Sequence, residues 1–302
     1  MSQARLTPLV AKSVANSLLC LSAFAWGATA AAQQNQVEDQ ANQQVEAAPA
    51  PKFLRVVRND RGVPQALETA IARYQSPDGV IVDLVGVVHI ADKDYYAKLN
   101  DVFAGYDSVL YELVAPPNKR PEPGRRGGGA VSGVQTGMTG MLDLAFQLDH
   151  IDYKKPNFVH ADMSPEEFSQ SMNDRGESVW QMVFRSIGYS AARQGTDGPG
   201  EIGMLQALFS SNRAVLMKRQ MATQFEDLEG GMAALEGPDG STLITERNRK
   251  AFEVLETEIQ SGKKKLAVFY GAGHLIDMDR RLRDDFKMKP LEMRWLRAWK
   301  ID

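Results

Sequence analysis

The spacing of apolar residues changes along the chain between a continuous pattern and a helical one, and this predicts strands interleaved with helices. Residues 80–90, VIVDLVGVVHI, are almost continuously apolar, which is typical of a strand covered on both faces. Residues 92–106 carry apolar side chains at helical spacing, with Asp92 as the expected N-cap. Residues 107–114, DSVLYELV, return to the pattern of a buried strand. This order predicts a βαβ unit with parallel strands.

Further strands are predicted on both sides of this unit. Residues 66–75, ALETAIARYQ, form a strand that the turn SPDG at 76–79 joins to the strand at 80–90. Near the C-terminus, residues 263–274, KKKLAVFYGAGH, predict another buried strand, and residues 290–299, PLEMRWLRAW, predict a closing strand.

The remaining apolar patterns are helical. They occupy residues 138–148, 164–172, 177–228, 245–262 and 275–286. Ser164, with Pro165 after it, and Thr245 are the candidate N-caps of two of these helices. A short strand, NFVHADM, precedes Ser164. The chain is therefore expected to fold as an α/β domain over residues 53–302, with a mixed β-sheet flanked by helices and a helical insertion at about 136–230.

The first fifty residues differ from the rest. Arg5 and Lys12 precede a short apolar run that ends in small residues, which is the pattern of a secretory signal peptide over residues 1–32 with cleavage after Ala32. The alternative is that this segment is not cleaved and stays in the membrane as an anchor helix. The apolar run is, however, shorter than the roughly 20 residues of a bilayer span. Residues 33–52 are rich in Gln, Ala and Pro and predict a disordered linker. We therefore expect a periplasmic or secreted protein with no stable membrane span after cleavage.

Net charge and cysteine content exclude some classes of partner and of catalytic site. The formal net charge of -3 gives no reason to expect nucleic acid as a partner. Cys20 is the only cysteine and would be lost with the signal peptide, so thiolate catalysis and a cysteine zinc site are excluded from the mature chain.

Two of the four histidines follow the same motif. His89 ends GVVH and His274 ends GAGH, each where an apolar strand meets a predicted helix. In open α/β sheets ligands bind beyond the carboxyl ends of the strands, so the two imidazoles converge if their strands are parallel neighbours. The strand DSVLYELV delivers Glu112 to the same edge, where a carboxylate is costly unless it is paired or bound to metal. Two imidazoles and one carboxylate are a common ligand set for zinc, manganese, cobalt or iron.

Other polar residues are candidates for the same site. His160 and Asp162 could complete the ligand set or orient a ligand histidine, and Asp162 could instead cap the following helix. Arg247 or Asn248, in the first turn of the helix at 245–262, could face a developing oxyanion, and Glu246 is a candidate general base. The alternative for these three residues is a solvated, charged first turn in which Arg247 pairs with a nearby acid. The structural alternative for the paired motifs is that the glycines fit tight turns and the histidines cap helices.

At these residues the chain resembles the TraB/PrgY/GumN family, which is related to the TIKI metalloproteases and more distantly to the erythromycin esterase and ChaN-like proteins. The segments that carry the resemblance are LVGVVHIADKDYY, DSVLYELV, ITERNRKAFEVLE and KLAVFYGAGHLIDM. It covers roughly residues 75–286. The resemblance implies a fold in which the two histidine motifs face each other across a site.

The TIKI branch of this family implies an activity as well. Carried over, His89, Glu112 and His274 become ligands of a divalent metal in a peptidase, and Arg247 becomes a residue that faces the substrate or the transition state. The loop PPNKRPEPGRRGGG at 116–129 departs from the family pattern. Other members are known as inhibitors of peptide pheromone signalling or as polysaccharide-linked factors, so membership does not by itself imply catalysis.

The leading hypothesis is an exported hydrolase that depends on manganese, cobalt or zinc and acts on peptide or protein substrates. If Glu112 binds the metal, Asp162 or Glu246 is the candidate general base. The alternative is a non-catalytic regulatory protein whose pocket holds a peptide, or haem through one histidine.

Overall fold

The computed structural model of the protein describes residues 51–121, 142, 144–178, 210, 212–226, 236 and 239–301. The predicted signal peptide, the predicted linker up to residue 50, residues 122–129 of the Pro- and Gly-rich loop, and residues 179–209 of the predicted helical insertion lie outside these residues. Among the described residues, no helix is both long enough and apolar enough to cross a membrane.

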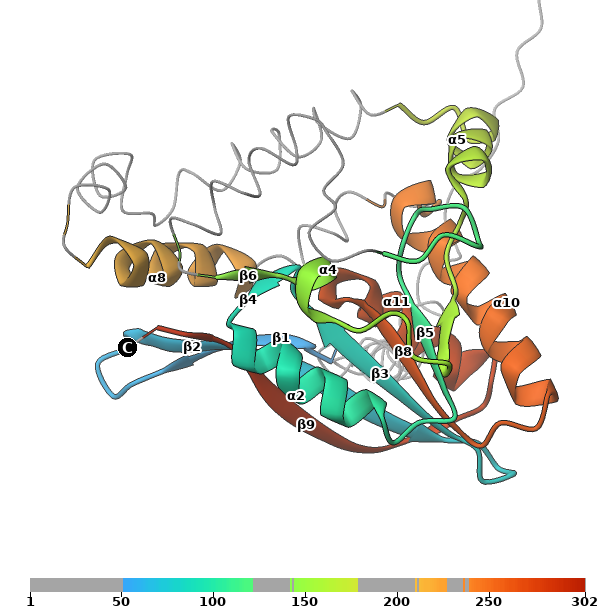
Figure 1. Cartoon of the computed structure of the whole chain (residues 1–302), viewed down its shortest axis with the longest axis horizontal. Helices are drawn as coiled ribbons and strands as arrows, with labels where there is room; N and C mark the ends of the chain where they lie inside the picture. The colour runs from blue at the N-terminus through green and yellow to red at the C-terminus, as the bar shows by residue number, and fades with distance from the viewer. Residues whose placement is uncertain are drawn as a thin grey trace, which may run out of the picture. The chain divides into compact units, whose positions relative to one another are not determined.

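A mixed sheet forms the centre of the described fold (Figure 1), which confirms the predicted α/β class. Its strands are β1 (Leu54–Arg58), β2 (Pro64–Gln75), β3 (Ile81–Val87), β5 (Ser108–Tyr111), β7 (Phe158–His160), β8 (Lys265–Gly271) and β9 (Lys289–Lys300). Their order is β1-β2-β3-β8-β5-β7, and β9 pairs with β2. The strands β3, β8, β5 and β7 are parallel, whereas β1, β2, β3 and β9 pair in antiparallel fashion.

The order of these strands refines the predicted βαβ unit. The helix α2 (Lys93–Phe103) connects β3 to β5, but β8 lies between the two strands and is parallel to both. The predicted hairpin of β2 and β3 is confirmed, and its turn ends at Gly79 in the left-handed region, with φ of 81°.

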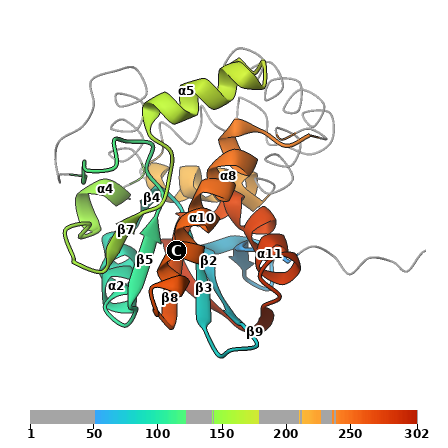
Figure 2. The ribbon, with the colours of Figure 1, turned by 90° about the vertical axis from the view of Figure 1, so that its right-hand side faces the viewer.

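Helices cover both faces of the sheet, as Figures 1 and 2 show. On one face, α2 buries aromatic and leucine side chains in a cluster that includes Val85, Val109 and Phe269 of the strands. On the other, α10 (Arg247–Gln260) and α11 (Leu275–Asp284) pack in a cluster with Leu84 and Val268. Successive strand residues point to opposite faces, so a strand covered on both sides needs apolar residues at every position. This explains the continuous apolar runs.

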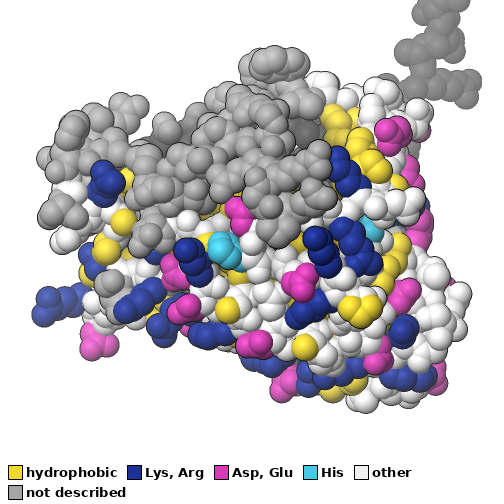
Figure 3. All heavy atoms as spheres, viewed as in Figure 1, with side chains coloured by type: hydrophobic (Ala, Val, Ile, Leu, Met, Phe, Trp, Pro, Cys, Tyr) yellow, Lys and Arg dark blue, Asp and Glu magenta, His cyan; other side chains and the backbone are white. Residues whose placement is uncertain are grey.

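The remaining described elements lie around this core. They are β4 (Ile90–Ala91), β6 (Ala145–Phe146), α4 (Gln147–His150), α5 (Pro165–Asp174), α8 (Arg213–Glu226), a π-helical turn (Thr242–Glu246) before α10, and a 3₁₀ turn (Ala272–His274) before α11. On the face seen in Figure 3, Lys and Arg side chains of the described residues are interspersed with Asp and Glu.

The helix ends agree only partly with the predicted caps. Ser164 caps α5 through a capping box with Glu167, which confirms that prediction. Asp92 precedes α2 but its carboxylate accepts hydrogen bonds from Lys300 N and Lys218 Nζ, not from the helix. The prediction of Thr245 as an N-cap is wrong, because Ser241 caps the helical segment that begins at Thr242.

The prediction of a helix at 138–148 is wrong for residues 145 and 146. Ala145 and Phe146 form β6, which pairs with β4 through Ala91 and Ile90. This pairing between distant segments overrides the local apolar spacing. The helix α4 starts at Gln147 and makes a single turn.

Gly86 and Gly271, which open the two histidine motifs, have different neighbours. Gly86 is needed for close packing between β3 and the elements beside it. A Cβ on Gly86 would lie 3.1 Å from Leu275 Cδ2 and 3.3 Å from Ala70 O. We expect Gly86→Ala to lower the free energy of unfolding by about 1–3 kcal/mol, because the buried strand and α11 cannot both keep their positions. Urea denaturation of the purified protein measures this change.

Gly105→Ala is the matched control. Its Cβ would lie 3.5 Å from Lys265 Nζ, which is the end of a flexible side chain. The expected change is within about 0.5 kcal/mol. If the two variants unfold at the same urea concentration, close packing does not explain Gly86.

Candidate functional site

Parallel pairing of β3 and β8 brings the two histidine motifs to the same edge of the sheet. Val87, the last residue of β3, lies opposite Gly271, the last residue of β8. His89 lies two residues after Val87, beyond the end of the strand, and His274 ends the 3₁₀ turn that follows Gly271. The strands before the two histidines are therefore parallel neighbours, as the predicted convergence of the imidazoles required.

Gly271 lies at the centre of the converging side chains. The position that a Cβ on Gly271 would occupy is 3.2 Å from Glu112 Oε2, 3.7 Å from His89 Nε2 and 3.8 Å from His274 Cδ2. All three side chains thus lie around one point that is open only because residue 271 is glycine. Its φ of -51° is allowed for any residue, so proximity and not backbone conformation explains the glycine.

The carboxylate of Glu112 is held by two different donors. Its Oε2 accepts a 2.7 Å hydrogen bond from Gly271 N, and its Oε1 accepts a 2.6 Å bond from Arg247 Nη2. Burial alone would raise the pKa of Glu112, but the neighbouring His274, Arg247 and His89 and the Gly271 amide together hold it well below its ordinary value. The side chain, 12% exposed, is therefore ionised at neutral pH.

Arg247 lies between two buried carboxylates. Besides Glu112, it donates from Nε to Asp162 Oδ1 at 3.0 Å and from Nη2 to Asp162 Oδ2 at 2.7 Å. Burial would lower the pKa of Arg247, but the two carboxylates outweigh it and keep the guanidinium charged. Arg247 thus neutralises buried negative charge, and Asp162 serves it as a bidentate partner.

Asn248 fixes the orientation of the His274 ring. Asn248 Nδ2 donates to His274 O at 3.1 Å and to Asp277 Oδ2 at 2.9 Å, and both of these oxygens only accept. The amide oxygen of Asn248 therefore faces His274 Nδ1, at 2.7 Å, and this nitrogen must carry the proton. Burial lowers the pKa of His274 to about 4, so the ring is neutral at pH 7 and Nε2 carries a lone pair.

Two acceptors therefore face each other inside the site. His274 Nε2 lies 3.5 Å from Glu112 Oε1, which is too long for a hydrogen bond, and neither atom carries a proton at neutral pH. Such an arrangement is unfavourable unless a positive charge or a donor lies beside both atoms. Arg247 supplies this for Glu112 but has no hydrogen bond to His274 among the described contacts.

His89 has an amide partner of its own. Its Nδ1 lies 2.9 Å from Gln147 Oε1, and Gln147 Nε2 donates to Tyr153 OH at 2.8 Å. The His89 residue is exposed, whereas Gln147 is buried. The site therefore opens to solvent at His89. Gln147 and Tyr153 were not predicted from the sequence, where the signal for them is a glutamine within an apolar run.

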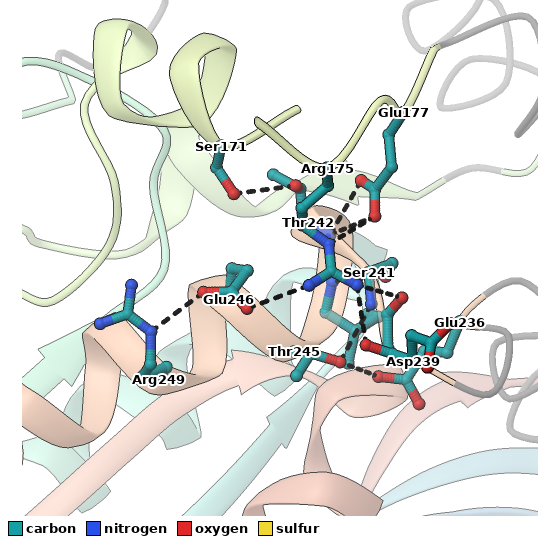
Figure 4. A network of polar contacts seen from close by, with 12 residues as sticks. Ser171, Arg175, Glu177, Glu236, Asp239, Ser241, Thr242, Thr245, Glu246 and Arg249 are labelled. Carbon is teal, nitrogen blue, oxygen red and sulfur yellow. Dashed lines mark hydrogen bonds and ion pairs between the residues drawn. The ribbon is translucent and has the colours of Figure 1, made fainter. Parts of the chain in front are cut away.

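Two predicted site residues have partners elsewhere. His160 Nε2 lies 2.6 Å from Leu113 O. Glu246 pairs with Arg175 at 3.4 Å and with Arg249 at 3.0 Å. Figure 4 shows this second network, in which Arg175 reaches from the end of α5 toward the π-helical turn. Neither residue contacts His89 or His274 among the described interactions.

The separation of the donor atoms bears on whether they can share a divalent cation. Within the described residues, no group of three or more His, Cys, Asp or Glu side chains is placed so that it could hold a metal ion. Nitrogen and oxygen ligands lie about 2.0–2.2 Å from zinc, so two of them at a tetrahedral angle lie about 3.4 Å apart. The 3.5 Å between His274 Nε2 and Glu112 Oε1 fits this separation. A carboxylate also offers about four acceptor positions, of which two are used here.

No protein-family model, no curated protein and no solved structure matches this chain.

The buried charges make Arg247 a test of the site's electrostatics. Arg247→Met keeps the apolar stem but leaves Glu112 and Asp162 without their shared cation. We expect a loss of about 3–5 kcal/mol in the free energy of unfolding, because two buried carboxylates lose their partner. Chemical denaturation at neutral pH measures this loss.

Arg249→Met, on the same helix, is the matched control. The Arg249 side chain is 54% exposed, and its pairs with Glu246 and Glu253 lie near the surface. Its removal is expected to cost less than about 1 kcal/mol. Equal losses in the two variants would show that Arg247 neutralises no buried charge.

Proposed function

We propose that this protein is an exported, divalent-metal-dependent hydrolase with a TraB/GumN- and TIKI-like fold, and that it acts on peptide bonds. His89, His274 and Glu112 hold the cation, which is manganese, cobalt or zinc. The observation that carries the proposal is the approach of unprotonated His274 Nε2 to ionised Glu112 Oε1 at 3.5 Å, with His89 Nε2 beside the same glycine. A shared cation turns this repulsive contact into a favourable one.

The peptide substrate and the export are supported by sequence. The paired GxxH motifs and the helix that begins ERN resemble the TIKI branch, which implies a peptidase. The signal-peptide pattern of residues 1–32 supports a periplasmic or secreted location.

The chain's own residues have separable roles in this proposal. Asn248 holds His274 with its proton on Nδ1, and the Gly271 amide holds the Glu112 carboxylate against the site. Arg247 balances the charge of Glu112. The exposure of His89 provides the open side at which a substrate carbonyl can enter. A divalent cation bound there supplies Lewis acidity, which polarises a carbonyl and lowers the pKa of water.

Three carboxylates are candidates for ligand or base, and they have different partners. Glu112 lies against His274. Asp162 accepts from Arg247 with both oxygens, and Glu246 pairs with Arg175 and Arg249. We therefore assign the cation to Glu112 and give neither of the others the role of general base.

Removal of either motif histidine tests the proposal. Protein purified without chelators should contain manganese, cobalt or zinc, measured by elemental analysis, and His89→Ala and His274→Ala should lose it while remaining folded by circular dichroism. The reason is that each variant removes one ligand of the set. His150→Ala is the matched control, because that ring stacks on Tyr96 and should leave metal content unchanged.

Activity is tested with a peptide library, with and without EDTA. Cleavage that EDTA abolishes and metal restores is the expected result. Metal retained by both motif variants would contradict the proposal. So would a Soret band in the visible spectrum of the purified wild type, which would favour the haem-binding alternative.

A further inference from the structure

His89 is exposed, yet it is attached to the fold at two points by one buried residue. Gln147 N donates to His89 O at 2.9 Å, and Gln147 Oε1 lies 2.9 Å from His89 Nδ1. Gln147 is the first residue of α4, directly after β6, and the pairing of β6 with β4 holds it next to the end of β3. The backbone and the ring of His89 therefore depend on the same side chain and its segment.

The other end of Gln147 is also fixed. Its Nε2 donates to Tyr153 OH at 2.8 Å. The Tyr153 ring is buried and packs edge-on against Tyr111 and Phe158, with centroids 5.0 and 5.7 Å away. The hydroxyl is therefore held in place by the core. Gln147 links an exposed imidazole to a rigid aromatic cluster.

The orientation of the Gln147 amide decides which nitrogen of His89 can bind a cation. With Oε1 on Nδ1, the ring carries its proton on Nδ1, and Nε2 has a free lone pair. With the amide turned over, its NH₂ would face Nδ1, the proton would lie on Nε2, and this nitrogen could not be a ligand. Nε2 is the atom that lies beside Gly271.

The second histidine shows the same arrangement without ambiguity. Asn248 presents its amide oxygen to His274 Nδ1 at 2.7 Å, because its NH₂ faces two oxygens that only accept. Both motif histidines therefore pair through Nδ1 with a buried side-chain amide, from α4 in one case and α10 in the other. A histidine that merely caps a helix needs no such partner.

We propose that Gln147 is a positioning residue that holds His89 as the Nδ1–H tautomer, so that Nε2 of His89 is free beside Gly271. Gln147 and Asn248 thus form a matched pair of amides, one for each imidazole. Amide or carboxylate partners of this kind orient metal-bound histidines and raise their basicity. The inference rests on the proposed metal site, and it assigns a role to a residue outside the two histidine motifs.

The proton position can be observed directly. Long-range proton–nitrogen NMR of ¹⁵N-labelled, metal-free protein distinguishes the two tautomers of each of the four histidines at a pH where the rings are neutral. We expect Nδ1–H for His89 and His274 in the wild type. In Gln147→Met, which keeps the length of the side chain but has no amide, we expect His89 to move to Nε2–H while His274 stays unchanged.

Two further variants separate positioning from a general loss of structure. Gln147→Glu keeps an acceptor and should restore the Nδ1–H tautomer of His89. Tyr153→Phe keeps the ring packing and should produce a smaller shift in the same direction as Gln147→Met. An unchanged His274 signal in all three variants shows that the fold is intact. The inference is overturned if wild-type His89 is the Nε2–H tautomer, or if Gln147→Met leaves the His89 tautomer unchanged.

A metal titration connects the tautomer to the proposed function. Gln147→Met should bind Co²⁺ about 10–100-fold more weakly than the wild type, and Gln147→Glu should retain binding. Equal Co²⁺ affinity in the wild type and Gln147→Met would overturn the positioning role. If the wild type itself binds no Co²⁺, the metal-dependent function fails, whereas the NMR result still decides whether Gln147 sets the proton position.

Discussion

Backbone hydrogen bonds between β3 and β8 hold the two histidine segments side by side, and the candidate site depends on this pairing. The register that places Val87 opposite Gly271 brings both strands to an end at the same level of the sheet. A shift of the pairing by one residue would turn every side chain of one strand to the other face, and the two buried clusters would lose their fit. Packing on both faces therefore fixes the register, and the register fixes the distance between His89 and His274.

At this edge of the sheet, the fold buries the negative charge of Glu112 and surrounds it with groups that stabilise it. The carboxylate of Glu112 has the Gly271 amide on one oxygen and Arg247 on the other, and Arg247 is itself oriented by Asp162. A buried ion cluster of this kind contributes little net stability compared with apolar packing, and its cost is expected where function requires the charge. Each imidazole in turn has its own amide partner, so charge and proton positions are set by residues on several separate elements.

The sequence predicts the parts of this site that follow from local patterns. Continuous apolar runs identify β3, β5 and β8 because each is covered on both faces, and the glycine before each histidine indicates the end of a strand. The parts it misses depend on distant partners. Gln147 lies in a run whose spacing resembles a helix, and only the pairing of β6 with β4 places it beside His89. For Arg247 the sequence left a substrate-facing role and a pairing with an acid both open, and it did not identify Asp162, its bidentate partner, which lies far away in the sequence.

The central claim is that His89, His274 and Glu112 share one divalent cation beside Gly271. The most direct measurement is anomalous X-ray diffraction from crystals grown with Co²⁺. The account predicts an anomalous peak about 2.0–2.3 Å from Nε2 of both histidines and from an oxygen of Glu112. A structure with Co²⁺ bound only at His150 or His160, or with the His89 and His274 rings turned away from each other and no peak between them, would contradict it.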